Sequence, residues 1–188
     1  NGKVVDGIGG GVCQVSTTLY GAVLRAELEV TERHGHSMTV AYVKPAEDAA
    51  IADGYKDLKF KNNTEFPIYI EGYVSGGKIT FNIYGKETRP SNRVITFESE
   101  IISENDPETE FTLSSAEPVG SFIQTRSKHV GYVAKYWKIV TVDGVETDRV
   151  QINKSTYKSS FRKVTIGTKG ATAEELAKIK EALKTKDD

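Results

Sequence analysis

The stretch Gly9-Gly10-Gly11-Val12-Cys13-Gln14-Val15-Ser16-Thr17-Thr18-Leu19-Tyr20 opens the one long helical pattern in the first part of the chain. Behind the three glycines, apolar residues recur at steps of three and four through residues 13–28, at Val15, Leu19, Ala22, Val23 and Ala26. This spacing predicts an amphipathic helix whose apolar face packs against the domain core. The glycines predict a flexible loop that leads directly into the helix N-terminus.

Strand patterns follow this helix. Residues 29–43 and 57–61 alternate between polar and apolar side chains, which is typical of half-buried strands. Residues 67–74 and 78–84 flank Ser75-Gly76-Gly77, and a glycine pair supplies the positive φ that a tight hairpin requires. We therefore expect an α+β N-terminal domain, with one helix packed on an antiparallel sheet.

The second part of the chain has no comparable helical pattern. Residues 130–142 and 149–153 are rich in β-branched and aromatic side chains, and Asp143-Gly144 between them is a strong hairpin signal. This part is therefore expected to be all-β. Thr172 and Glu175 have the spacing of a capping box, which predicts a short C-terminal helix.

A polar stretch at residues 86–92 that includes a proline favours a connector between the two parts. We expect an N-terminal domain at residues 1–92, an all-β domain at residues 93–170, and a terminal helix or tail at residues 171–188. The chain begins at Asn1 without a signal peptide, so we expect a processed or excised fragment.

Composition excludes several classes of protein. The 25 basic and 26 acidic residues of this 188-residue chain give a formal net charge of −1, so no basic footprint for nucleic acid or an anionic membrane exists. Hydrophobic residues make up 38% of the chain, and no apolar run is long enough to span a bilayer. With one cysteine, no internal disulfide is possible, so the sequence around that cysteine must indicate whether it is inert or reactive.

Cys13 stands at the start of the predicted helix, immediately after the glycine loop. The unpaired amides and the dipole of a helix N-terminus favour negative charge, so this position favours a nucleophilic thiolate. We expect the backbone amides of Gly11, Val12 and Gln14 to act as oxyanion donors.

Two histidines in Arg33-His34-Gly35-His36-Ser37 are candidates for a general base. In an extended strand, His34 and His36 would share one face, roughly 6.6 Å apart. We favour His36 as the base and His34 as a structural or substrate-orienting residue. A carboxylate is expected to orient the imidazole, and sequence spacing does not rank the candidates Asp48, Asp53 and Asp57.

These residues have three other interpretations. A lone cysteine is commonly a small core side chain. Cys13 with His34 and His36 would be a partial zinc site, but structural zinc has four ligands and His129 lies in the other expected domain. The glycine run lacks the further residues of a nucleotide-binding loop. We therefore expect no metal and no nucleotide.

The first part of the chain resembles the VanW family. The motifs that carry this resemblance are Gly9–Tyr20, Glu32–Ser37 and Asp57–Thr64, and the similarity covers about residues 1–86. That family extends further upstream, so the resemblance implies that this chain begins inside the domain and lacks strands of the substrate groove. Residues 93–170 resemble a G-five domain, a β-rich module of surface proteins, through glycines 120, 131, 144, 167 and 170.

The VanW resemblance implies an L,D-transpeptidase that forms 3-3 cross-links in peptidoglycan, with Cys13 as the nucleophile and no cofactor. The familiar L,D-transpeptidase signature, in which the histidine precedes the cysteine, is absent here. The groups expected to contact donor carboxylates or other parts of the substrate are Ser16, Thr17, Arg33 and Ser37. The alternatives are an L,D-carboxypeptidase that uses the same cysteine and a noncatalytic peptidoglycan-binding surface protein.

The same resemblances imply partners and a location. The expected partners are peptidoglycan stem peptides and, through the G-five domain, glycan amino sugars, but no nucleic acid. The expected location is the cell wall or the outer face of a Gram-positive bacterium, with any membrane anchor in a segment outside this chain.

Overall fold

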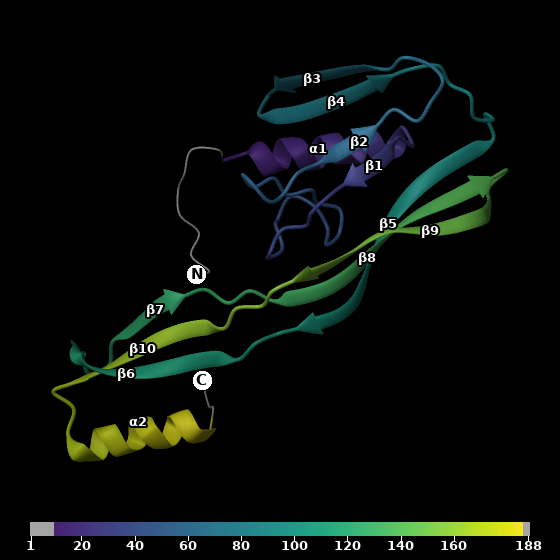
Figure 1. The fold of residues 1–188 in the computed structure, drawn as a ribbon. Coiled ribbons are helices and arrows are strands. Elements are labelled where there is room, and N and C mark those ends of the chain that lie inside the picture. The colour runs from purple at the N-terminus through teal and green to yellow at the C-terminus, as the bar shows by residue number, and fades with distance from the viewer. Residues whose placement is uncertain (1–9, 186–188) are drawn as a thin grey trace. The chain divides into compact units, whose positions relative to one another are not determined.

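The computed structural model describes residues 10–185, and within this range the chain forms two helices and four small sheets (Figure 1). The helices are α1 (Val12–Arg25) and α2 (Ala173–Thr185). The strands are β1 (Glu29–Glu32), β2 (Lys59–Lys61), β3 (Tyr69–Ser75), β4 (Lys78–Tyr84), β5 (Arg93–Asn105), β6 (Thr109–Pro118), β7 (Phe122–Arg126), β8 (Gly131–Val142), β9 (Val145–Tyr157) and β10 (Arg162–Lys169). Gly9 and the residues before it lie outside the described range.

The described chain divides into two compact units. The larger contains residues 10–104 and 132–157, and the smaller contains residues 105–131 and 158–185. The expected division after residue 92 therefore differs from the structural one. Most of β5, together with nearly all of β8 and β9, belongs to the same unit as α1.

The core of the larger unit explains this grouping. Buried residues from α1, from the irregular segment after β1 and from β8 form one apolar cluster; they are Tyr20, Leu24, Ala46, Ala49, Ala134 and Tyr136. Phe97 of β5 and Ile152 of β9 pack against that cluster. Since removing this apolar surface from water is the main driving force of folding, α1 and the β5–β8–β9 sheet are held together.

Helix α1 buries a face that matches the expected one only in part, because Val23 is buried as expected but other residues differ. Val15 is 41% exposed, whereas Ser16 and Thr17 are only 7% and 4% exposed. Both buried hydroxyls donate to the carbonyl oxygen of Ala49, at 2.5 and 3.2 Å. These bonds satisfy the polar groups, so the helix can bury a face that is partly polar. Hydrophobic periodicity alone does not identify such a face.

The helix also ends earlier than residue 28. Its last residue is Arg25, and Glu27 has a left-handed backbone with φ of 55°. The Glu27 carboxylate accepts hydrogen bonds from Arg93 at 2.6 Å and from Lys138 at 3.1 Å. The bond from Arg93, opposed by burial and helped by Lys138, lowers the pKa of Glu27 to about 2. These ion pairs hold a conformation that ends the helix.

Both expected hairpins are confirmed. Strands β3 and β4 pair antiparallel across Gly76 and Gly77, with φ of 55° and 73°. Strands β8 and β9 pair antiparallel across Asp143 and Gly144, with φ of 53° and 80°. Positive φ at both central residues matches the twist of the flanking strands, as expected for such turns.

The expected strand at residues 29–43 is mostly wrong. Only Glu29–Glu32 is a strand, paired antiparallel with β2, and residues 33–58 are largely irregular. His34 and His36 therefore lie in an irregular segment and do not share a strand face. Side-chain hydrogen bonds replace sheet pairing there, and alternation of residue types does not reveal them.

In the smaller unit, β10 pairs parallel with β6 and antiparallel with β7. The capping box is confirmed at the start of α2. The backbone N–H of Thr172 donates to the Glu175 carboxylate at 2.8 Å, and the N–H of Glu175 donates to the Thr172 hydroxyl at 3.2 Å. The described chain is thus mostly β-sheet with two helices.

We predict that Gly167→Ala in β10 destabilises the chain by at least about 2 kcal/mol. A methyl group there would overlap the carbonyl oxygen of Pro118 and the hydroxyl of Ser121. Urea unfolding followed by circular dichroism measures the change. Gly85→Ala is the control, because its methyl would lie 3.4 Å from Ile68, an ordinary contact. Equal stability of the two variants would contradict the prediction.

Candidate active site

Among residues 10–185, the first backbone amides of helix α1 have no hydrogen-bond partner. Gly11 caps the helix with φ of 100°, a left-handed conformation that favours glycine, and no side chain caps the helix there. The first intrahelical bond runs from the N–H of Val15 to the carbonyl of Gly11 at 2.9 Å. The N–H groups of Val12, Cys13 and Gln14 therefore precede the helical hydrogen-bond ladder and have the geometry of anion donors.

Cys13 is partly buried and binds a neighbouring backbone. Its thiol donates to the carbonyl oxygen of Ile51 and accepts from the N–H of Ile51, both at 3.4 Å. Ser16 and Thr17, one turn further along the same face, bind Ala49. These two hydroxyls were expected at the substrate, and their burial against Ala49 corrects that expectation.

His36 and Asp48 form a close pair. The Nδ1 of His36 lies 2.5 Å from the Oδ2 of Asp48, and the backbone N–H of His36 donates to the same oxygen at 2.6 Å. An ionised carboxylate only accepts hydrogen bonds, so Nδ1 carries the proton. In the neutral ring this leaves Nε2 as the proton acceptor, which is the tautomer that a general base needs.

Asp48 is 1% exposed and stays ionised through its hydrogen bonds. Its second oxygen accepts from the Arg33 guanidinium at 2.8 Å and from the Tyr157 hydroxyl at 2.5 Å. Burial by itself would raise the pKa of Asp48, but the bonds from His36 and Tyr157 and the charge of Arg33 outweigh it and lower the pKa to about 2.

Arg33 was expected to contact substrate, but it is a buried structural residue. Its side chain is 8% exposed and donates to the carbonyl of Asp48 at 2.6 Å and to the Ser155 hydroxyl at 2.7 Å. The guanidinium also lies over the ring of Tyr20, 5.7 Å from its centroid. These contacts position the Asp48 segment and leave Arg33 little surface for a ligand.

Residues of β9 complete this network. The Tyr157 hydroxyl accepts from the N–H of Ala46 at 2.6 Å while it donates to Asp48. Asn153 donates to the carbonyl of Ala46 and to the Tyr20 hydroxyl, both at 3.0 Å. Sequence reasoning missed these residues because they lie more than a hundred positions from their partners and belong to no local motif.

The remaining candidates lie elsewhere. His34 pairs with Glu32 at 3.2 Å and its side chain is 40% exposed. Asp57 accepts from the N–H of Leu58 at 2.8 Å, and Asp53 and Ser37 are exposed. Among the three aspartates, the structure brings Asp48 to His36.

Tyr42, which sequence reasoning also missed, contacts His36 and interacts electrostatically with Cys13. Its ring meets that of His36 edge-on, with centroids 6.3 Å apart. Burial raises the pKa of Tyr42; a hydrogen bond with Thr17 opposes the rise, and electrostatic interactions with Cys13 and Asp48 add to it. Tyr42 therefore lies within electrostatic reach of the thiol and in contact with the imidazole.

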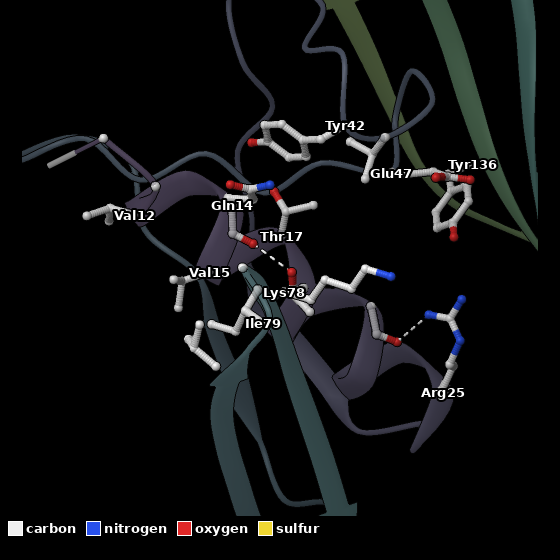
Figure 2. A pocket seen from close by; sticks show the side chains of 17 residues that line it. Val12, Gln14, Val15, Thr17, Arg25, Tyr42, Glu47, Lys78, Ile79 and Tyr136 are labelled. Carbon is white, nitrogen blue, oxygen red and sulfur yellow. Dashed lines mark hydrogen bonds between the residues drawn. The ribbon is translucent and has the colours of Figure 1, made fainter. Parts of the chain in front are cut away.

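A pocket of about 770 Å³ runs along α1 beside this site (Figure 2). Its walls are α1, the segment after His36, the turn between β3 and β4, and Tyr136. The lining includes Gly11, Val12, Gln14, Tyr42 and Lys78. Cys13 and His36 are not in the lining, but the two neighbours of Cys13 in sequence are.

Within residues 10–185, no cluster of three or more His, Cys, Asp or Glu side chains is arranged to hold a metal. Neither described helix combines the length and the apolar character needed to cross a membrane.

We predict that Tyr157→Phe lowers the free energy of unfolding by about 2 kcal/mol at neutral pH, because a buried charged acceptor loses a donor. In the parent chain the pKa of Asp48 is about 2 instead of 3.8. Ionised Asp48 therefore stabilises the fold fully above pH 3.8, and this stabilisation is lost as the pH falls toward 2. In the Tyr157→Phe chain the pKa of Asp48 is lowered less. The difference in free energy of unfolding between parent and variant should therefore shrink as the pH falls.

Unfolding measured between pH 7 and pH 2 tests this prediction. Tyr73→Phe, at an exposed ring on β3, is the matched control and should leave stability unchanged. A deficit that stays constant with pH would show that Tyr157 stabilises the fold without acting on Asp48.

The comparisons with known proteins agree with the sequence motifs. The VanW-like protein family model matches residues 1–84. Protein YoaR of Bacillus subtilis is 40% identical over 86 residues, which is 46% of this chain and 28% of that protein. The vancomycin B-type resistance protein VanW of Enterococcus faecalis is 35% identical over 71 residues, which is 35% of this chain and 26% of that protein. This chain spans about a quarter of the length of either relative.

Two of the solved structures that match are G-five domains. That of an IgA1 protease is 23% identical with a TM-score of 0.31, and the match covers 41% of this chain and 93% of that domain. That of HP0197 is 14% identical with a TM-score of 0.25, and the match covers 41% of this chain and all of that domain. At residues 1–84 this chain carries a VanW-like domain, as the sequence resemblance implies.

Proposed function

We propose that this chain is the catalytic part of a cell-wall L,D-transpeptidase that forms 3-3 cross-links through an acyl-enzyme on Cys13. The observation that carries the proposal is the segment 48–51. Asp48 binds His36, Ala50 donates to the carbonyl of His34 at 2.7 Å, and Ile51 binds the Cys13 thiol. Four consecutive residues thus tie the candidate base to the candidate nucleophile.

The proposed acylation starts with transfer of the Cys13 proton to Nε2 of His36. The thiolate then attacks the carbonyl at the L-centre of meso-diaminopimelate in a tetrapeptide stem. The C–N bond to D-alanine breaks, and the imidazolium returns the proton to the leaving amine. The products are a thioester on Cys13 and free D-alanine.

The second half-reaction resolves this thioester. The side-chain amine of another stem peptide attacks the carbonyl, His36 accepts the amine proton, and the C–S bond breaks. The proton then returns to the thiolate, which regenerates Cys13 and leaves an amide cross-link. Water in place of the amine would release the shortened stem and make the enzyme an L,D-carboxypeptidase.

Two features of the site support acyl transfer. The amides that precede the hydrogen-bond ladder at the start of α1 are suited to a developing oxyanion beside Cys13. Asp48 holds the His36 tautomer and would stabilise the imidazolium that forms during the reaction. Gly11 allows the close backbone approach that this geometry requires.

The partners and the location follow from the same proposal. Stem peptides would bind at the site described above, and the G-five-like region, proposed at residues 93–170, would engage glycan amino sugars. The protein would act in the cell wall or on the outer face of a Gram-positive bacterium. A noncatalytic wall-binding protein is the competing function if the thiol proves unreactive.

We predict that the chain converts purified disaccharide-tetrapeptides into 3-3 linked dimers with release of D-alanine, and that Cys13→Ala loses all of this activity. Mass spectrometry of the muropeptides detects the products, and intact-protein mass detects the thioester. Monomeric tripeptide alone would identify the carboxypeptidase. Equal product from parent and Cys13→Ala would reject the cysteine mechanism, and absence of product and adduct would favour the noncatalytic function.

We predict that His36→Gln slows turnover by about 10²- to 10⁴-fold, the usual contribution of a general base. His34→Gln is the matched control and should change the rate by less than about tenfold, because His34 pairs with Glu32 away from Asp48. Iodoacetamide alkylation of Cys13 across pH 5 to 10 provides a second readout. If both variants had the same pH profile as the parent, His36 would not be the base.

A further inference from the structure

The pocket along α1 is an elongated groove with room for a peptide. Its lining extends along the helix from Val12 to Arg25. Thirteen helical steps of 1.5 Å correspond to about 20 Å, which is the length of roughly six extended residues. The opposite wall is formed by Val74, Lys78 and Ile79 at the turn of the β3–β4 hairpin (Figure 2).

The end of the groove beside Cys13 is apolar. Val12 and Val15, which are 49% and 41% exposed, line this end, and Val74, which is 70% exposed, is also part of the lining. Exposed aliphatic side chains in a groove favour the burial of a ligand's apolar surface. Tyr42 borders the same end, as Figure 2 shows, and links it to His36.

The rest of the groove carries an excess of positive charge. Lys78 extends from the start of β4 into the groove and has no ion-pair partner among residues 10–185. Arg25 donates to the carbonyl of Gly21 at 2.8 Å and forms no ion pair with a carboxylate of residues 10–185. Glu47 is the one carboxylate of the described lining, and its oxygen accepts from the N–H of Lys44 at 3.3 Å.

We propose that this groove binds an acidic peptide, with its reacting carbonyl at the Cys13 end and its carboxylates at Lys78 and Arg25. The direction of the peptide rests on the proposed function, because Cys13 defines where the carbonyl lies. Charge-assisted hydrogen bonds from Lys78 and Arg25 to carboxylates supply affinity. The groove therefore favours donor peptides that carry carboxylates, and it recognises these carboxylates away from the bond that breaks.

Substitution of Glu47 should change the binding affinity in the direction opposite to substitution of Lys78, which gives a second test. The charge of Glu47 contributes, after burial, to the rise of the pKa of Tyr136 to about 12, so its field acts within the groove. The carboxylate opposes an anionic ligand that the two cations attract. Glu47→Gln keeps an oxygen to accept from Lys44 and removes the negative charge, so it should strengthen acidic-peptide binding while Lys78→Gln weakens it.

The experiment is calorimetric binding of a synthetic tetrapeptide that contains γ-D-glutamate and meso-diaminopimelate to the Cys13→Ser chain. The comparison peptide has the same sequence with its side-chain and terminal carboxylates amidated. We expect Lys78→Gln to weaken binding of the acidic peptide by roughly fivefold, the effect of about 1 kcal/mol, and Lys78→Glu to weaken it further. Lys61→Gln, on exposed β2 and outside the groove, is the control and should have no effect.

Three results would overturn the proposal: equal affinity for the acidic and amidated peptides, no effect of Lys78→Glu, or equal effects at Lys61 and Lys78. The binding measurement needs no chemistry, so it separates the groove from the catalytic proposal. Charge-dependent binding without transpeptidation would support the groove and reject the catalytic role of Cys13. Cross-linking with charge-independent binding would support catalysis and reject the groove.

Discussion

The arrangement of the candidate site depends on the attachment of residues 48–51 to α1. The Cys13 thiol and the Ser16 and Thr17 hydroxyls on one face of the helix bind the backbone of Ile51 and Ala49. The same segment carries Asp48, which fixes His36. Because residues 33–58 are largely irregular, these hydrogen bonds do what sheet pairing would do elsewhere. The positions of the candidate nucleophile and the candidate base are therefore coupled.

The buried carboxylate at the centre of this arrangement is stabilised by several donors together. Asp48 accepts bonds from His36, Arg33 and Tyr157, and Arg33 is itself bound to Ser155. An ionised group with so little solvent contact is costly unless its acceptor sites are filled. The network satisfies this requirement, and the bonds of Arg33, Ser155 and Tyr157 thereby fix the position of Asp48.

The sequence predicted the elements with strong local signals and missed those set by distant contacts. Both tight hairpins and the capping box of α2 are confirmed, since their residues act within a few positions. The start of α1 and its cysteine were placed correctly. The predicted buried face of α1 was only partly right: Val23 is buried, but the buried hydroxyls of Ser16 and Thr17 were missed because their partners lie in another segment. Asp48 stood among three candidates, and only tertiary structure brings it to His36.

The region that matches the VanW family model ends at residue 84, whereas the groups that support its site extend to residue 157. Hydrogen bonds cross this boundary. They join Asn153 to the carbonyl of Ala46, Ser155 to the guanidinium of Arg33, and Tyr157 to the carboxylate of Asp48. Phe97 and Ala134 add apolar contacts to the same core. A fragment cut at the family boundary would leave Asp48 with fewer donors and α1 with an exposed apolar surface. The catalytic unit proposed here therefore includes the β5–β8–β9 sheet, although sequence resemblance assigns that sheet to a different domain.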